Sequence, residues 1–198
     1  MSNSKQYAYE KQQQKNGAAA VNVAAVVKVT AFDPAKMTVD VQPLSKRLEG
    51  GNYTSQPPIL GVPVACTKGG GFVFRPWYKA GDIGAVVYID HDIDKAVAGG
   101  AETEPNTERN HSTSDAVFIG GIVPGNAPVS GLPSAALALG TEDGSIYIAV
   151  TAGKIQIQGD VEIAGNVTVS GGDVTADGIS LKTHTHTGDS GGSTSGPH

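Results

Sequence analysis

Apolar and polar residues alternate along residues 21–44, which read VNVAAVVKVTAFDPAKMTVDVQPL. A period of two places every second side chain on the same face of a β-strand, and Asp33-Pro34 between the two runs is a turn signal. The segment therefore predicts a β-hairpin with one buried face. The first strand would bury Val21, Val23, Ala25, Val27 and Val29, and the second would bury Met37, Val39 and Val41.

Three further apolar runs predict strands: ILGVPVAC (59–66), AVVYI (85–89) and AVFIGGIVPG (116–125). We expect loops at 48–58 and 98–115, where the sequence is polar and rich in glycine. Glycines 69–71 are expected to turn the backbone, because no Gly-Lys-Ser/Thr follows them as a phosphate-binding loop requires. About five short strands with almost no helical period favour an all-β fold, with a small barrel of the OB type over residues 18–125.

The pattern changes after Gly125. A linker (126–140) is followed by short alternating pieces, separated by Gly-containing turns. These pieces are Ile146/Ile148/Val150, Ile155/Ile157, Val161/Ile163 and Val167/Val169. Such small side chains cannot close a core in one chain, and repeated short strands are typical of a β-helix or solenoid. We therefore expect a shaft of three intertwined chains over residues 141–177, which makes the protein a homotrimer.

The charge and composition of the chain argue against some classes of protein. Of the 14 Lys and Arg residues only Lys154 and Lys182 follow Gly125, whereas seven of the 19 Asp and Glu residues do, so the net charge of −5 belongs to the last third. The sequence contains no basic patch or Lys/Arg run, and this argues against nucleic-acid binding. Cys66 is the single cysteine and is expected in the core. Residues 1–17 form a polar, Gln-rich tail, and no apolar run reaches about 18 residues, so we expect a soluble chain.

The segment THTHTGDSGG, residues 183–192, allows three functional interpretations beside a solvated tail. GDSGG surrounds the nucleophilic serine in some proteases, but only eight residues follow Ser190 and no triad setting precedes it. A metal-dependent hydrolase would need further ligands beside His184 and His186, and His198 is the one nearby candidate in the sequence. Two solvated histidines in a flexible tail are the simplest alternative.

The third interpretation uses the expected trimer. Residues two apart in an extended strand point the same way, so His184 and His186 would face one side together. Three chains then bring six imidazole nitrogens to one axis, which is an octahedral ligand set. Such a set suits iron or nickel better than zinc, which prefers four ligands in structural sites. With no coordination position open to a substrate, the metal would be structural and would cross-link the three chain ends.

Four stretches of the sequence are similar to one known family. They are VVKVTAFDPAKMTVDVQPL, VPVACTKGGGFVFRPWYKAGDIGAVVYIDHDID, RNHSTSDAVFIGGIVP and GDVTADGISLKTHTHTGDSGGSTSGP. Together they span most of the chain, which resembles the membrane-puncturing central spikes of contractile-tailed phages and tailocins, the baseplate-assembly-protein-V-like proteins. The second and fourth stretches are the most specific, because spikes of this group commonly end in ISLKTHxH followed by a Gly-rich turn. Ser195, inserted between Thr194 and Gly196, departs from the usual ending.

The resemblance implies an OB-fold domain that trimerises under the tail tube, a three-chain β-helix, and a pointed apex at 178–198. In similar spikes an axial iron is bound by the H-x-H histidines of all three chains, here His184 and His186, one ion per trimer. The implied role is mechanical piercing of the bacterial outer envelope, with no catalytic residues and no small-molecule substrate. The implied partners are baseplate hub and tail tube proteins. The chain would be assembled in the host cytoplasm and act at the baseplate tip of the virion.

Two further interpretations stay open beside the spike. A trimeric β-solenoid adhesin would bind a host receptor, although its shaft would be expected to expose more aromatic residues than Tyr147.

The alternating carboxylates Asp90, Asp92 and Asp94 could bind a cation, but a solvated strand end is the simpler interpretation. His111 is expected to satisfy backbone groups of its loop. GDSGG is expected to be a turn that folds the chain back over the tip.

Overall fold

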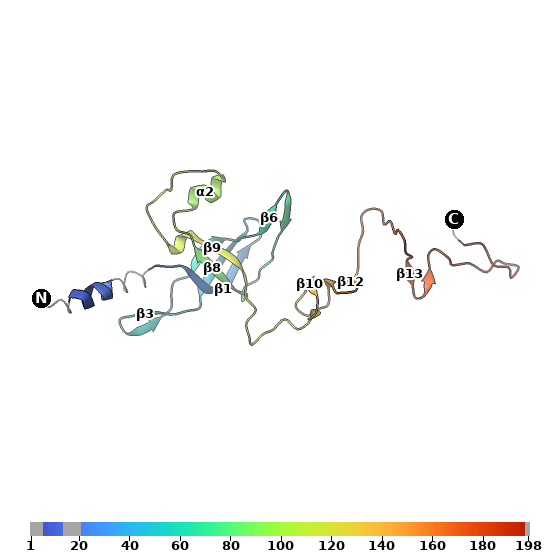
Figure 1. Ribbon diagram of the computed structural model, residues 1–198, viewed down its shortest axis with the longest axis horizontal. Coiled ribbons are helices and arrows are strands. Elements are labelled where there is room, and N and C mark those ends of the chain that lie inside the picture. The colour runs from blue at the N-terminus through green and yellow to red at the C-terminus, as the bar shows by residue number, and fades with distance from the viewer. Residues whose placement is uncertain (1–5, 14–20, 197–198) are drawn as a thin grey trace. The chain divides into compact units, whose positions relative to one another are not determined.

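The computed structural model describes residues 6–13 and 21–196 (Figure 1). The chain divides into two compact units, Met1–Val129 and Ser130–His198, which are treated separately below. Residues 6–13 are helical, whereas the rest of the predicted tail at 1–17 lies outside the described residues. Of the helices described, none has the length and apolar character needed to cross a membrane.

The first unit is built on one five-stranded antiparallel sheet with the strand order β5-β2-β1-β8-β9. Its strands are β1 (Ala24–Asp33), β2 (Thr38–Pro43), β5 (Ile59–Pro63), β8 (Ile83–Tyr88) and β9 (Ala116–Gly121). The sheet curls until its two edges meet, since the Ala65 N–H donates to the Phe118 carbonyl at 2.8 Å. Val64 and Phe118 form a parallel bridge at the same point. The prediction of an all-β fold is confirmed, and this curled sheet has the five strands of a partly open OB-type barrel.

The core lies on the concave side of this sheet. Its residues are Val27, Val29, Val39, Val41, Ile59, Val62, Val64, Val86, Tyr88, Ala116 and Phe118. The period-two prediction is confirmed for both strands of the first hairpin, where Ala25 and Met37 also pack against the core. It is wrong for Val21 and Val23, because they precede β1, and Val23 is 67% exposed.

The β1–β2 turn follows from the Asp33 side chain. Its Oδ1 accepts hydrogen bonds from the backbone N–H of Ala35 at 2.9 Å and of Lys36 at 3.1 Å. These bonds replace the sheet bonds that the turn residues lack. Met37 then takes a left-handed φ of 54° before β2 begins. The turn predicted at Asp33-Pro34 is confirmed.

Gly84 sets how closely β8 and β9 can pack. A Cβ atom at this position would lie 2.2 Å from Phe118 Cζ and 2.4 Å from the Gly120 carbonyl oxygen. We expect Gly84→Ala to destabilise the first unit by about 1–3 kcal/mol, because the buried Phe118 ring must move. Urea unfolding measures this, with Gly125→Ala, which meets no atom within 4 Å, as the control. Equal stability of the two variants would contradict the packing argument.

Two short hairpins leave the sheet (Figure 1). One pairs β3 (Arg47–Glu49) with β4 (Asn52–Thr54), and the other pairs β6 (Thr67–Gly69) with β7 (Phe72–Phe74). Both turns consist of two glycines with positive φ: Gly50 and Gly51, then Gly70 and Gly71. Such a turn matches the twist of two paired strands. The loop predicted at 48–58 is therefore wrong over β3–β4, while the glycines 69–71 do turn the backbone.

The β6–β7 hairpin carries unburied aromatic side chains. Phe72 is 83% exposed and Trp77, just after β7, is 73% exposed. Trp77 makes an edge contact with Phe32, at 5.5 Å between ring centroids. Phe32 in turn contacts Tyr78, which contacts the buried Phe118. A row of rings thus connects the barrel core to an uncovered surface.

Between β8 and β9 the chain makes a long excursion. It contains helix α2 (Asp94–Gly99) and the 3-10 turn η1 (Thr113–Asp115). The predicted loop at 98–115 therefore holds the end of one short helix and a single helical turn. The two ends of the excursion are joined by a bridge between His91 and Asn110.

The second unit has a different construction. A three-stranded antiparallel meander, β10 (Leu137–Gly140), β11 (Tyr147–Val150) and β12 (Ile155–Gln158), is followed by a small hairpin of β13 (Thr175–Ala176) and β14 (Ile179–Ser180). Among the described residues of this unit, Ala149 is the one buried apolar side chain. The apolar residues of the meander on the other face are 48–79% exposed. The second unit therefore has no hydrophobic core within one chain.

Candidate functional site

The β13–β14 hairpin leads into the segment that carries the two candidate metal ligands. Its turn is made by Asp177 and Gly178, with φ of 49° and 82°. Asp173 closes its base, because Asp173 Oδ1 accepts from the N–H of Val174 at 2.8 Å and of Lys182 at 3.1 Å. Hydrogen bonding, with Ser180 the largest contributor, lowers the pKa of Asp173 against the opposing effect of burial. The hairpin base is thus held by an ionised carboxylate near neutral pH.

His184 follows directly and is oriented by backbone. Its Nδ1 lies 2.9 Å from the Ser180 carbonyl oxygen and 3.2 Å from that of Leu181. Because a carbonyl can only accept, these contacts assign the proton to Nδ1. In the neutral imidazole this places the lone pair on Nε2, which is the arrangement by which proteins prepare a histidine to bind a metal.

His186 lies beside it. The two imidazole centroids are 5.2 Å apart with the rings nearly perpendicular, at 86°. The His186 N–H donates to Thr194 Oγ1 at 2.9 Å, and the Thr194 N–H donates to the His186 carbonyl at 2.8 Å. His186 is therefore fixed by the returning chain, and the structure brings both predicted ligands together.

The donor set is compatible with a transition metal but is incomplete among the described residues of one chain. Imidazole nitrogen suits iron, nickel, copper and zinc. In the described part of the chain, the group of three or more close ligand atoms is Asp92, Asp94 and Asp115, and neither His184 nor His186 belongs to it. Two imidazoles alone do not fill a coordination sphere, so a metal here needs ligands beyond His184 and His186.

GDSGG forms the turn that returns the chain past His186. The Gly188 N–H donates to the Gly192 carbonyl at 2.6 Å, and Thr187 and Ser193 form an antiparallel bridge. Gly191 adopts a left-handed φ of 78°. The Ser190 hydroxyl lies 3.5 Å from Asp189 Oδ1, and no hydrogen bond joins it to a histidine of the described residues. The predicted turn is confirmed, and His198 lies outside the described residues.

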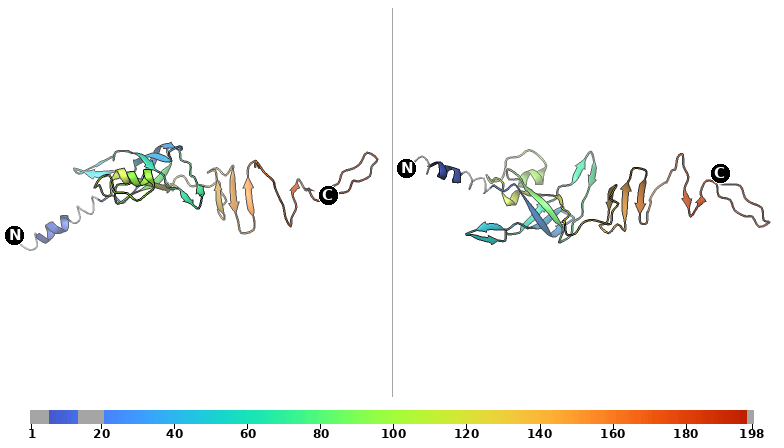
Figure 2. Two further views of the ribbon diagram at one scale, coloured as in Figure 1. Left: turned by 90° about the horizontal axis from the view of Figure 1, so that it is seen from above. Right: turned by 60° about the horizontal axis from the view of Figure 1, so that its bottom comes forward.

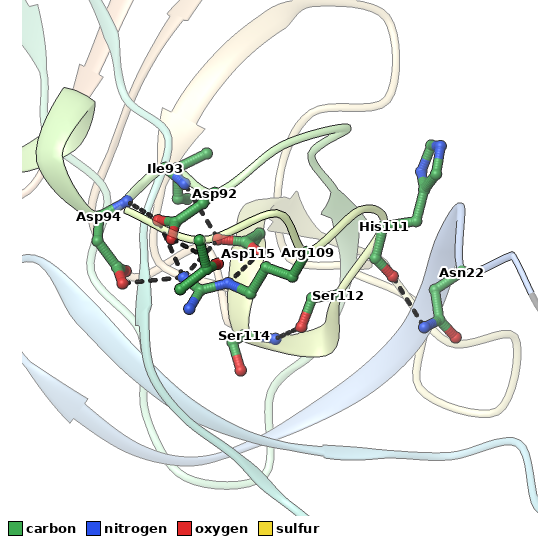
Figure 3. A network of polar contacts seen from close by, with 10 residues as sticks. Asn22, Asp92, Ile93, Asp94, Arg109, His111, Ser112, Ser114 and Asp115 are labelled. Carbon is green, nitrogen blue, oxygen red and sulfur yellow. Dashed lines mark hydrogen bonds and ion pairs between the residues drawn. The ribbon is translucent and has the colours of Figure 1, made fainter. Parts of the chain in front are cut away.

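A second polar cluster, which the sequence interpretation missed, lies in the excursion between β8 and β9 (Figure 3). Arg109 Nε and Nη2 form a bidentate pair with Asp115, at 2.7 and 2.9 Å. The same Nη2 lies 3.1 Å from Asp92 Oδ1 and 2.8 Å from Asp94 Oδ2. The Asp115 and Asp92 side chains are fully buried, whereas 28% of the Arg109 side chain is exposed. Arg109 thus occupies the centre of the three carboxylates.

The two buried carboxylates of this cluster accept further hydrogen bonds. Asp115 Oδ1 accepts from the Ile93 N–H at 3.0 Å, and Asp92 accepts from the Asp94 N–H and from the Thr107 hydroxyl. The interpretation of Asp90, Asp92 and Asp94 as a solvated strand end is therefore wrong for Asp92. The Arg109 guanidinium accounts for the close approach of Asp92, Asp94 and Asp115 without a metal ion. We call this group the Arg109 network.

Electrostatics agree with this geometry. Hydrogen bonding to Arg109 lowers the pKa of Asp115, against the opposing effect of burial. Burial raises the pKa of Asp92, but the Asp94 N–H, the Thr107 hydroxyl and Arg109 together bring it below its ordinary value. The pKa of Arg109 is raised, chiefly by its hydrogen bonds to Asp115 and Asp94. Asp92, Asp115 and Arg109 are therefore charged at neutral pH.

His111 fixes the other end of the excursion. Its carbonyl accepts from Asn22 Nδ2 at 2.9 Å, as Figure 3 shows, and its N–H donates to the Asp90 carbonyl. Its side-chain Nε2 lies 3.0 Å from Asp90 Oδ1. The backbone of His111 is used in the loop as expected, but its imidazole contacts a carboxylate and not a backbone group.

Comparison with protein families shows a similarity for the first unit. Residues 26–121 match the family described as phage protein Gp138 N-terminal domain. The matched range begins in β1 and ends in β9, so it covers the five-stranded sheet and the Arg109 network. No curated protein matches the chain. The first unit is thus similar to a domain of phage proteins, and this similarity supports a phage structural role.

Proposed function

We propose that this chain is the central spike of a contractile phage tail or tailocin, a homotrimer that mechanically pierces the bacterial cell envelope. The observation that carries the proposal is the combination of two units in one chain. Residues 26–121 match a phage-protein domain, and they are followed by a unit whose described residues form no core of their own. A phage structural protein of this kind acts in the virion and has no need of catalysis.

The meander β10–β12 supports the trimer. Its register aligns Leu137 with Val150 and Val150 with Ile155 in one row across the three strands. A second row aligns Leu139 with Ile148 and Ile148 with Ile157. Both rows lie on the same exposed face of the sheet. An apolar face of this kind is unfavourable in water, and two further copies of the chain would cover it.

The apex supports a structural metal. His184 and His186 of three chains would supply six Nε2 atoms to one iron ion on the axis, one ion per trimer. The iron would supply cross-linking of three chain ends, with no open position for a reaction. The Nδ1 contacts of His184 to Ser180 and Leu181 are what such a ligand requires.

The first unit would attach the spike to the particle. Phe72 and Trp77 on and after β7 offer an uncovered aromatic surface. Aromatic side chains dominate the buried centres of protein interfaces, so this surface suits the baseplate hub or tail tube proteins. The opposite end of the chain would meet the bacterial outer envelope during contraction.

Immunogold labelling of intact tail particles tests the location. Antibodies raised against residues 130–198 are expected to label the distal tip of the tail at the baseplate, and to stop labelling when preincubated with the purified chain. Label on the capsid or along the sheath would contradict the spike. Label at tail fibres, with specific binding of the purified chain to host glycans, would favour the adhesin instead.

A further inference from the structure

The first unit contains a pocket that the proposed piercing function does not use. It is lined by residues of β5 and η1 and by the base of the β3–β4 hairpin, which extends away from the sheet in both views of Figure 2. Its volume is about 320 Å³, at the lower end of the range of small-molecule sites. Its lining combines the apolar side chains of Pro57, Pro58 and Leu60 with the polar side chains of Arg47, Thr113 and Ser114.

The apolar wall is fixed in place before any ligand binds. Pro57 and Pro58 have a restricted φ and offer no N–H donor. Gln56, which precedes them, is tied to the segment after β2. Its Nε2 donates to the Ser45 carbonyl at 2.7 Å, and its own carbonyl accepts from Gln42 Nε2 at 2.8 Å. A preformed wall of this kind reduces the entropy that binding costs.

The polar part of the lining has unused hydrogen-bond donors. Arg47 Nη2 lies 3.4 Å from Asn22 Oδ1, which is a long hydrogen bond to a neutral acceptor, and no carboxylate of the described residues pairs with it. The Thr113 and Ser114 hydroxyls make no hydrogen bond within the described part of the chain. A guanidinium presents its N–H groups as a fork that matches a carboxylate. The pocket therefore favours an anionic ligand.

The Arg109 network holds the two hydroxyls at this pocket. They belong to η1, where Ser112 Oγ accepts from the Ser114 N–H at 3.2 Å. Asp115 ends η1 and is paired with Arg109 Nε at 2.7 Å. The buried ion pair thus fixes the turn that carries Thr113 and Ser114.

We propose that this pocket binds the C-terminal residue of a partner polypeptide, with its carboxylate on Arg47 and its apolar side chain against Pro57, Pro58 and Leu60. A chain end carries a carboxylate and a side chain on the same Cα atom, so both enter one small pocket. An acidic side chain within a chain, or a phosphate, brings the charge without the apolar group. Capture of a terminal carboxylate is an established mode of peptide recognition.

This inference goes beyond the proposed function. It uses residues 42–60 and 112–115 of the first unit alone, and it requires neither a trimer nor a bound metal. The site would give the first unit specificity for one protein end, in addition to any contact made by the aromatic surface of Phe72 and Trp77.

Two peptides that differ in one terminal group test the ligand class. They are acetyl-Ala-Ala-Leu with a free carboxylate and the same peptide as its C-terminal amide. NMR of the isotope-labelled full chain is expected to show saturable shifts of the Gln56, Thr113 and Ser114 amides with the free carboxylate. The amide should bind at least about tenfold more weakly, because a hydrogen-bonded charge is lost. Equal binding of the two peptides would overturn the assignment, as would equally tight binding of inorganic phosphate.

The variant Arg47→Met tests the residue. It is expected to weaken binding of the free-carboxylate peptide by at least about tenfold. Lys46→Met is the matched control, because it removes the adjacent exposed cation, which does not line the pocket. Equal weakening by both variants would overturn the site, since net charge alone would then explain binding. Absence of binding to the unmodified protein would also overturn it and would leave the spike standing. Peptide binding by a protein that proves monomeric would support the site and contradict the spike.

Discussion

The double variant His184→Ala/His186→Ala is expected to contain no iron, while the unmodified protein contains about one ion for every three chains. Both imidazoles are removed, and the remaining groups near them are backbone carbonyls, threonine hydroxyls and Asp189, which do not form a six-nitrogen site. The measurement is elemental analysis of protein expressed in iron-supplemented medium, with the chain concentration determined independently.

The matched control for this experiment is Thr185→Ala/Thr187→Ala, which alters the alternate positions of the same segment. It is expected to keep its iron and its trimer. The double histidine variant is expected to remain trimeric, because the Val and Ile faces of the shaft are intact, but its chain end should become more sensitive to protease. Unchanged iron content in the histidine variant would refute the apex site. Zinc near one ion per chain in the unmodified protein would refute it as well.

The variant Arg109→Met is expected to be the most destabilising single substitution in the first unit. It leaves the fully buried Asp115 carboxylate without its bidentate partner, beside the equally buried Asp92. Leaving a buried charge uncompensated costs roughly 3 kcal/mol or more. Lys95→Met is the control, because it removes one exposed positive charge from helix α2 of the same excursion. Urea unfolding at pH 7 measures both variants.

The contribution of Asp92 and Asp115 to the free energy of unfolding should change with pH in opposite directions in the unmodified protein and in Arg109→Met. In the unmodified protein the pKa values of Asp92 and Asp115 are lowered, so their contribution is complete above the ordinary carboxylate pKa and is lost as the pH falls through their folded values. In Arg109→Met burial dominates and raises both pKa values, so protonation in acid should relieve the cost. The difference in free energy of unfolding between the unmodified protein and Arg109→Met is expected to become smaller as the pH falls from 7 to 4. A gap that stays constant would show that Arg109 acts by packing alone.

The barrel could be predicted from the sequence wherever a strand was long enough to show its period. The alternation of Val27, Val29, Val39 and Val41 identified the first hairpin and its buried face. The β3–β4 hairpin could not be predicted in this way, because strands of three residues contain too few positions to show alternation. Its signal was the pair Gly50-Gly51, which permits a two-residue hairpin turn.

The Arg109 network had no comparable signal. Arg109 and Asp92 are joined only because the chain between β8 and β9 leaves the sheet and returns, which is a tertiary contact without periodicity. The two candidate metal ligands, by contrast, could be predicted from the sequence. The spacing of His184 and His186 predicts neighbouring rings, and the structure brings them together at 5.2 Å. The residues that orient them, Ser180 and Thr194, depend on two turns and could not be predicted from spacing.

Native mass spectrometry of the intact protein tests the central claim most directly, since one spectrum reports both the number of chains and the bound metal. The account predicts a single species of three 20.1 kDa chains with the added mass of one iron ion. A species of one chain, or a metal-free trimer from iron-supplemented cells, would contradict the metal-stapled trimeric spike.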